Sequence, residues 1–204
     1  TPLKNAVIEL SQEHDRDHAI IMRTSADGQF RLKNIPPGQY EMSVSRNGYV
    51  TRKYGQKKPT DPGSKVTLRP GQSLSDLVFT LQRAAVITGK VLDEDGEPMA
   101  GVAVQALEHA FREGKKKLNY TAGTQTDDLG MYRLFGLAPG RYYVCADGTG
   151  GSDEVGDKEF SGAEKTGPEK AYTKTYYPGT SDVSKAVSLQ VKEGEEIPSV
   201  DVLM

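Results

Sequence analysis

The sequence predicts an all-β protein built from two tandem β-sandwich domains, and the main observation behind this is an internal repeat. A series of turn-forming and core-forming residues recurs 102 positions further along the chain. The first copy is Thr24, Gly28, Phe30-Arg31-Leu32, Pro37-Gly38 and Tyr40, and the second is Thr126, Gly130, Tyr132-Arg133-Leu134, Pro139-Gly140 and Tyr142. Self-similarity at this scale indicates a duplicated folding unit. The 204 residues therefore divide into domains at 1–83 and 84–204, each long enough to bury its own core.

Short runs of alternating apolar and polar residues, bounded by Gly, Pro, Asn or Asp, predict half-buried strands. They lie at 30–32, 40–44, 65–68 and 77–81 in the first copy, and at 86–92, 102–106, 132–134, 142–146, 186–189 and 200–204 in the second. This density predicts about six or seven strands per domain. Only residues 107–118 offer a place for a short helix.

The offset between the copies changes along the chain, and each change predicts an insertion in the second copy. Pro2 matches Pro98 at an offset of 96, Val66 matches Val187 at 121, and Gly71 matches Gly194 at 123. We therefore expect insertions of 6, 19 and 2 residues in the second domain.

The first copy has no counterpart of residues 86–92, so we expect it to lack its opening strand. Thr1 is then expected to be a truncation point within a larger protein. The residues before it would supply the strand, and without them the first domain exposes a strand position. By contrast Gln82-Arg83 runs directly into Ala84-Ala85, which predicts a stiff junction between the domains.

Four motifs of the second copy carry a family resemblance: 86–91, 95–102, 130–134 and 137–142. Together they resemble carboxypeptidase regulatory-like domains, which are transthyretin-like (prealbumin-like or Ig-like) β-sandwiches related to the B-type repeats of collagen adhesins. The resemblance implies a non-catalytic accessory module of a bacterial protein in the periplasm, at the outer membrane or on the cell surface. It also implies a fold group that includes carbohydrate-binding domains.

Composition excludes several classes of function. The 26 Lys and Arg nearly balance the 28 Asp and Glu, so nucleic acid is not an expected partner. No apolar run reaches the ~20 residues that span a bilayer, so direct membrane insertion is not expected. The single cysteine, Cys145, cannot form an internal disulfide and is interpreted as a bystander.

The chain contains no motif that predicts an enzyme. It has no nucleophile elbow and no phosphate-binding glycine loop. It has only three His residues that could serve in a catalytic triad. The cluster His14-Asp15-Arg16-Asp17-His18 is interpreted as a solvated loop, and Asp93-Glu94-Asp95-Gly96 as a turn between strands. We expect no catalytic residues, no metal ligands and no cofactor.

Aromatic residues are the remaining candidates for a ligand or partner surface. By strand parity Phe135, Tyr143 and Cys145 face outward, where the first copy has Lys33, Glu41 and Ser43. An apolar outward face needs a cover, which we expect to be the polar insertion at about 148–170 or a neighbouring molecule or domain.

Tyr172, Tyr176 and Tyr177 follow that insertion and either pack on an edge strand or form a sugar platform. The candidate surface is thus Phe135, Tyr143, Tyr172, Tyr176 and Tyr177. The leading hypothesis is a spacer or docking module that contacts a protein partner or other domains of the same chain. The alternative is a carbohydrate-binding module.

Overall fold

The computed structural model describes residues 1–12, 15–59, 61–112, 115–148 and 172–204, which form two compact units. Unit 1 spans Thr1–Ala84 and unit 2 spans Ala85–Met204. Within the described residues, no helix has the length and apolar character needed to cross a membrane.

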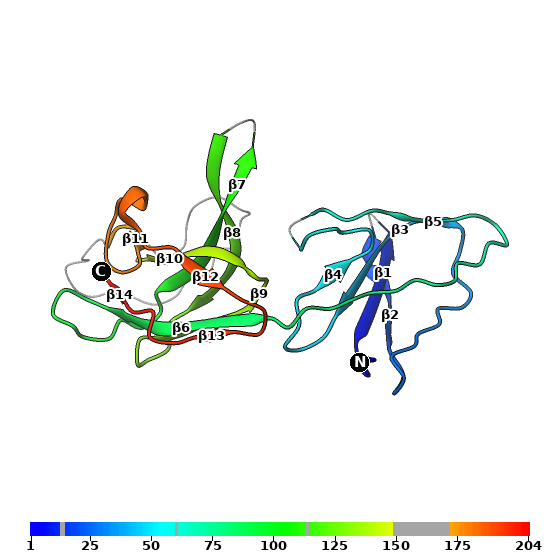
Figure 1. The fold of residues 1–204 in the computed structure, drawn as a ribbon, viewed down its shortest axis with the longest axis horizontal. Helices are drawn as coiled ribbons and strands as arrows, with labels where there is room; N and C mark the ends of the chain where they lie inside the picture. The colour runs from blue at the N-terminus through cyan, green and yellow to red at the C-terminus, as the bar shows by residue number, and fades with distance from the viewer. Residues whose placement is uncertain (13–14, 60, 113–114, 149–171) are drawn as a thin grey trace. The chain divides into compact units, whose positions relative to one another are not determined.

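Unit 2 is a sandwich of two β-sheets (Figure 1). Its strands are β6 (Ala85–Leu92), β7 (Ala103–Arg112), β8 (Lys115–Gln125), β9 (Met131–Leu137), β10 (Gly140–Asp147), β11 (Thr175–Tyr176), β12 (Leu189–Val191), β13 (Glu196–Ile197) and β14 (Val202–Leu203), with a short 3₁₀ helix at Val183–Lys185. One sheet has the order β11-β10-β7-β8, with β12 also paired to β10. The other is centred on β6, which pairs with β9, β13 and β14. Alternate residues of each sheet point inward and form one core, as the burial of Ile87, Val104 and Val144 shows.

Unit 1 contains only the first of these sheets. Its strands are β1 (Val7–Gln12), β2 (Asp15–Arg23), β3 (Gly38–Ser45), β4 (Arg52–Lys53) and β5 (Val66–Leu68). The sheet has the order β2-β1-β3-β4, with β5 also paired to β3. Its core consists of Ala6, Ile8, Leu10, Tyr40, Met42, Val44 and Val66. Among the described residues of unit 1, no strand corresponds to β6.

The two units follow the same backbone path where they correspond. Residues in the left-handed region, which Gly and Asn tolerate best, recur in pairs. The pairs are Asn5 and Gly101 at an offset of 96, Gly28 and Gly130 together with Asn34 and Gly136 at 102, and Gly71 and Gly194 together with Asp76 and Ser199 at 123. The structure therefore confirms the repeat and its first and last offsets.

The residues shared by both copies stabilise the fold. The Tyr40 hydroxyl donates a hydrogen bond to the Pro36 carbonyl, and Tyr142 donates to Ala138 in the same way, each at 2.8 Å. These bonds fix the turn that leads into β3 or β10 and satisfy a phenol whose ring is buried in the core.

Two details of the repeat are different from the prediction. The place considered for a short helix, 107–118, holds none among its described residues: 107–112 and 115–118 belong to β7 and β8, which pair as a hairpin that the six-residue insertion lengthens relative to β1–β2. The offset of 121 is wrong. Tyr40 pairs with Val66 and Tyr142 with Leu189, so strand pairing sets an offset of 123, and the second domain carries one further insertion between β10 and β11.

The strands expected at 30–32 and 77–81 are absent from unit 1, where both segments are coil. Their counterparts in unit 2 are part of β9 and the segment that includes β14, and both pair with β6. A strand needs a partner for its backbone groups, so without a β6 these segments remain unpaired despite their alternating sequence.

Candidate functional site

The structure does not bring the five candidate aromatic residues together. Phe135 lies on β9 in the sheet centred on β6, whereas Tyr143 lies on β10 in the other sheet. The expected single outward face is therefore wrong. The Phe135 side chain is 64% exposed, and the Arg133 guanidinium lies 5.7 Å from its ring centroid. This contact is a cation–π interaction on an open surface.

Tyr143 and Tyr176 do share a face, which we call the outer face of unit 2. It is the side of the β11-β10-β7-β8 sheet opposite the core, and it carries Leu107, His109, Tyr143, Cys145 and Tyr176. Tyr143 is half-buried, with its ring edge-to-face with His109 at 5.0 Å. Leu107 is 7% exposed. The predicted cover, residues 148–170, lies almost wholly outside the described residues.

Cys145 lies on the outer face, as its strand parity predicts, and it is fully buried there. Strand parity correctly placed it opposite the core, but parity does not reveal what covers a side chain. It pairs across the sheet with Tyr176. Burial raises the pKa of the Cys145 thiol to about 12, so the thiol is protonated at neutral pH and cannot act as a nucleophile.

Beside Cys145 lies an ion pair that the sequence analysis did not predict. The Lys174 ammonium is 3.5 Å from the Asp147 carboxylate, whose side chain is only 7% exposed. Desolvation alone would lower the pKa of Lys174, but the Asp147 carboxylate raises it above its ordinary value. The two residues are 27 positions apart on either side of the long insertion, so no sequence spacing signals the pair.

Tyr172 and Tyr177 have separate environments. Tyr177 packs against the core of unit 2, and its backbone N–H donates to the Val144 carbonyl at 2.9 Å. The Tyr172 hydroxyl donates to Glu94 at 3.3 Å. Since Tyr177 faces the core and Phe135 lies in the other sheet, the five residues form no common stacking platform.

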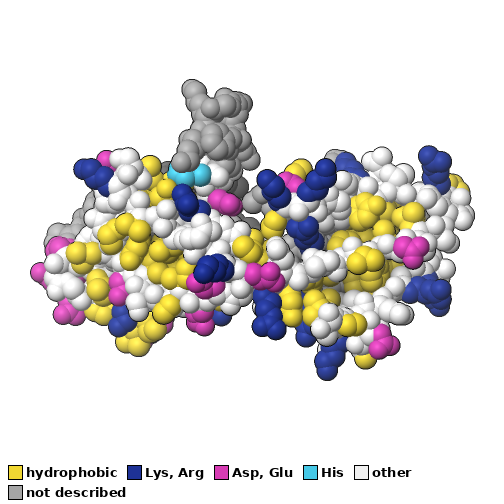
Figure 2. Space-filling model, in the orientation of Figure 1, with side chains coloured by type: hydrophobic (Ala, Val, Ile, Leu, Met, Phe, Trp, Pro, Cys, Tyr) yellow, Lys and Arg dark blue, Asp and Glu magenta, His cyan; other side chains and the backbone are white. Residues whose placement is uncertain are grey.

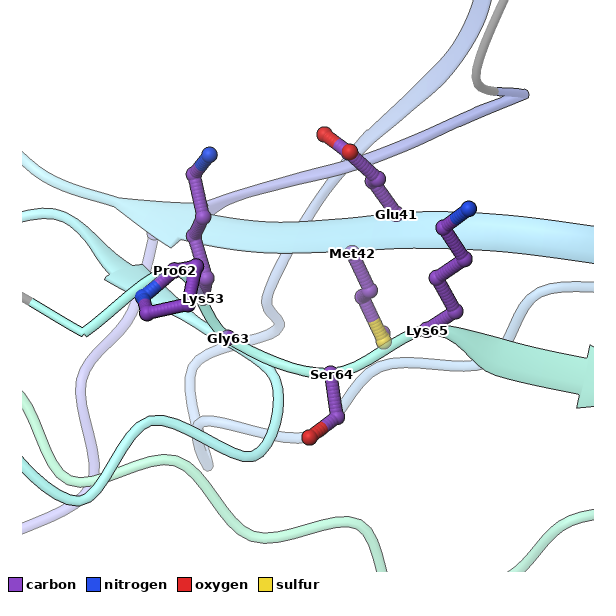
Figure 3. Close-up of a pocket in the computed structure, with 7 residues that line it drawn as sticks. All are labelled: Glu41, Met42, Lys53, Pro62, Gly63, Ser64 and Lys65. Atoms are coloured by element: carbon purple, nitrogen blue, oxygen red, sulfur yellow. The ribbon is translucent and has the colours of Figure 1, made fainter.

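Unit 1 has a shallow hollow between β3, β4 and residues 62–65 (Figure 3). Its volume is about 160 Å³, below the roughly 300–1,000 Å³ of typical ligand sites. Figure 3 shows the charged ends of Glu41, Lys53 and Lys65 on one side of the chain, with Met42 and Ser64 directed the other way. The hollow is too small and too mixed in character to hold a drug-sized ligand.

Metal ligands offer no alternative site within the described ranges. No group of three or more His, Cys, Asp or Glu comes together among the described residues, and His14 lies outside them. Figure 2 shows side chains of both charge signs on the visible face of each unit.

Taken together, the two sheets of unit 2 and the matching sheet of unit 1 define a tandem β-sandwich protein. The family model for the carboxypeptidase regulatory-like domain matches residues 1–82 and 86–161. The chain therefore belongs to the carboxypeptidase regulatory-like domain family.

Similarity to known proteins extends to eukaryotes. The chain is 28% identical over 156 residues to the BOS complex subunit NOMO1 of Mus musculus, and 27% identical over the same length to NOMO3 of Homo sapiens. These alignments cover 76% of this chain and 11% of the relative, so the chain spans about a tenth of the length of the curated relatives it matches.

Solved structures were also similar at low identity. The minor pilin GBS52 of Streptococcus agalactiae shares 12% identity with a TM-score of 0.33, covering 100% of this chain and 83% of the pilin. The shaft pilin SpaA of Lactobacillus rhamnosus GG, as a D295N mutant, shares 14% identity with a TM-score of 0.34, covering 100% of this chain and 88% of that chain.

Proposed function

We propose that this chain is a non-catalytic structural and interaction module, a spacer or docking element of a larger exported or cell-surface protein. The observation that carries the proposal is the set of groups to which the polar residues shared by both units bond. Thr24, Thr126, Tyr40 and Tyr142 all direct their hydroxyl groups to the backbone of their own unit. Duplication has thus preserved a scaffold rather than a reactive site.

The chemistry of unit 2 supports the absence of catalysis. Its cysteine is buried and protonated, and its two most buried hydroxyl-bearing rings, Tyr132 and Tyr142, have pKa values raised by burial. An acid–base catalyst needs a pKa near the working pH and access to a substrate, and these groups have neither.

Membership of the family supports docking in particular. The chain belongs to the carboxypeptidase regulatory-like domain family, and its NOMO relatives are subunits of the BOS complex. The half-buried outer face around Tyr143 and Tyr176 is the surface of unit 2 that we assign to a protein partner or to another domain of the same chain.

Binding to polysaccharides tests this proposal against its alternative. The chain and a matched Tyr143→Ala/Tyr176→Ala variant are incubated with cellulose, chitin and peptidoglycan and pelleted. A spacer or docking module stays in the supernatant in both forms. Retention of the unaltered chain that is lost in the variant would favour the carbohydrate-binding function instead. Fractionation of the source cells tests the extracytoplasmic placement, which predicts recovery outside the cytoplasm.

A further inference from the structure

The sheet centred on β6 presents one side to the core of unit 2 and the other side away from it, and we call this second side the β6 face. Ile87 and Val91 on β6 and Leu134 on β9 point into the core. The residues that alternate with them therefore lie on the β6 face. They include Val86, Thr88 and Lys90 on β6 and Met131, Arg133 and Phe135 on β9.

Three large apolar side chains of the β6 face are exposed. Met131 is 46% exposed, Phe135 is 64% exposed and Leu203, on β14, is 50% exposed. Leu203 belongs to this face because its neighbour Val202 is buried in the core. Apolar side chains that gather on one surface among polar residues mark a site of interaction with another molecule.

The charged residues of the β6 face are separated by sign. The cations are Lys90 on the central strand and Arg133 on β9. The acids lie on the opposite side of β6, where β13 and β14 run beside it (Figure 1). Glu196 pairs with Val86, and the Asp201 carboxylate accepts a hydrogen bond from the Lys90 N–H at 2.8 Å. Since all four charged side chains are exposed, the face has a basic edge at β9 and an acidic edge at β13 and β14.

Unit 1 has none of this pattern at the corresponding positions. Gln29, Lys33 and Thr80 stand where unit 2 has its three exposed apolar residues, and Ser73 and Val78 stand where it has its two acids. Both units follow the same backbone path through these segments, as their left-handed residues show. The shared scaffold therefore does not require the apolar residues or the acidic edge, and both are specific to unit 2.

A face with one basic and one acidic edge is complementary to a second copy of itself. A two-fold axis parallel to β6 places β9 of each copy over β13 and β14 of the other. Arg133 pairs with Thr88, which lies between Val86 and Lys90 on β6. Its guanidinium then meets the other copy between Glu196 and Asp201, and symmetry repeats this contact.

We propose that the β6 face is a self-association surface, and that its occupant is the same face of a second copy of this chain. Opposite charges meet at both edges of the contact, which fixes its orientation. The Arg133 guanidinium already lies 5.7 Å from the Phe135 ring centroid, so this pair supplies both an apolar and a charged part of the contact. The face is one small sheet, so the association is weak.

Sedimentation velocity of the full chain at concentrations up to about 1 mM tests the proposal, because small interfaces need high concentrations to fill. We expect the mass to rise from monomer toward dimer. Phe135→Lys installs the residue of unit 1 and should weaken the association at least about tenfold. The matched control is Val78→Lys, which makes the same kind of change at an 86% exposed residue of unit 1 and should leave the association unchanged.

Charge reversal tests the orientation of the two copies. Arg133→Glu and Glu196→Arg should each weaken self-association, because each sets like charges against each other across the axis. An equimolar mixture of these two variants should associate more tightly than either variant alone, since the exchanged charges meet in the mixed dimer.

A monomeric mass at every concentration would overturn the proposal, as would equal association of the Phe135→Lys and Val78→Lys variants. A mixture no tighter than the single variants would overturn the pairing of opposite edges. The inference goes beyond the proposed function, because the β6 face is distinct from the outer face of unit 2. The two can fail separately, since retention on a polysaccharide would defeat the proposed function without changing the sedimentation of the chain.

Discussion

The hydroxyl groups of Thr24 and Thr126 make the same two hydrogen bonds at equivalent points of the two units. Thr126 accepts from the Val102 N–H at 2.9 Å and donates to the Met99 carbonyl at 2.7 Å. Thr24 accepts from the Ala6 N–H at 2.9 Å and donates to the Leu3 carbonyl. In each unit a buried threonine that directly follows the first hairpin (β1–β2 or β7–β8) thus bonds to the backbone of the turn that precedes this hairpin.

Replacement of Thr126 by Val should destabilise unit 2. Valine has the same shape but leaves the Val102 N–H and the Met99 carbonyl without their partner, which costs about 2 kcal/mol in the free energy of unfolding. Urea denaturation followed by circular dichroism measures the loss. Thr126→Ser is the control and should recover most of the stability; a Val variant as stable as the unaltered chain would show that the two bonds contribute nothing.

Gly89→Ala should destabilise unit 2 by at least about 2 kcal/mol, because the added methyl group overlaps the Val200 carbonyl and forces the two segments apart. Thermal unfolding of the variant is compared with that of Lys90→Ala, which alters the adjacent, exposed residue of the same strand. Equal melting temperatures for the two variants would contradict the close approach of β6 to residue 200.

Lys174→Met should destabilise unit 2 by about 1–2 kcal/mol, because it leaves the Asp147 carboxylate buried without its cation. The partial exposure of Lys174 keeps the effect below that of a fully buried pair. Adding Asp147→Asn to this variant removes the buried negative charge and should restore part of the loss. A double variant less stable than Lys174→Met alone would contradict this explanation.

Cys145 should resist alkylation in the folded chain. Its pKa is raised from an ordinary value of 9.0 to about 12, so the folded state favours the protonated thiol. The resulting stabilisation is fully present below about pH 9 and is lost as the pH rises toward about 12. At pH 8 we expect iodoacetamide to label the native chain at least about tenfold more slowly than the urea-unfolded chain. Equal labelling rates would show that the thiol is accessible.

Much of the fold was predictable because each position in one copy of the repeat can be compared with its counterpart in the other copy. Turn residues such as Gly28 and Gly130 and core residues such as Tyr40 and Tyr142 lie where the repeated pattern places them. The change of offset placed the six-residue insertion between Pro98 and Thr126, and the structure shows that it lengthens the β7–β8 hairpin. The failures arose where pairing over long distances overrides local pattern. Residues 77–81 alternate like a strand but pair with no strand among the described residues, and residues 107–112 and 115–118 are held in β7 and β8 by cross-strand pairing.

The candidate surface was less predictable for a different reason. Parity assigns a side chain to one side of its strand, but it does not say in which sheet that strand lies or what covers it. Phe135 and Tyr143 accordingly belong to different sheets, and Cys145 is buried although it points away from the core. The Asp147–Lys174 pair depends on how the chain returns after the long insertion, which no local pattern encodes.

Native-state hydrogen exchange tests most directly the central claim, that the two units share one backbone path and that β6 gives the segment around residue 200 of unit 2 its strand partner. The amides of Leu77 and Val200 occupy equivalent positions, and only Val200 has a strand partner, the carbonyl of Thr88. We predict that the Val200 amide exchanges at least about a hundredfold more slowly than that of Leu77, after correction for their intrinsic rates. Comparable protection at the two amides would contradict the account, because it would mean that the edge at residues 77–81 is already paired.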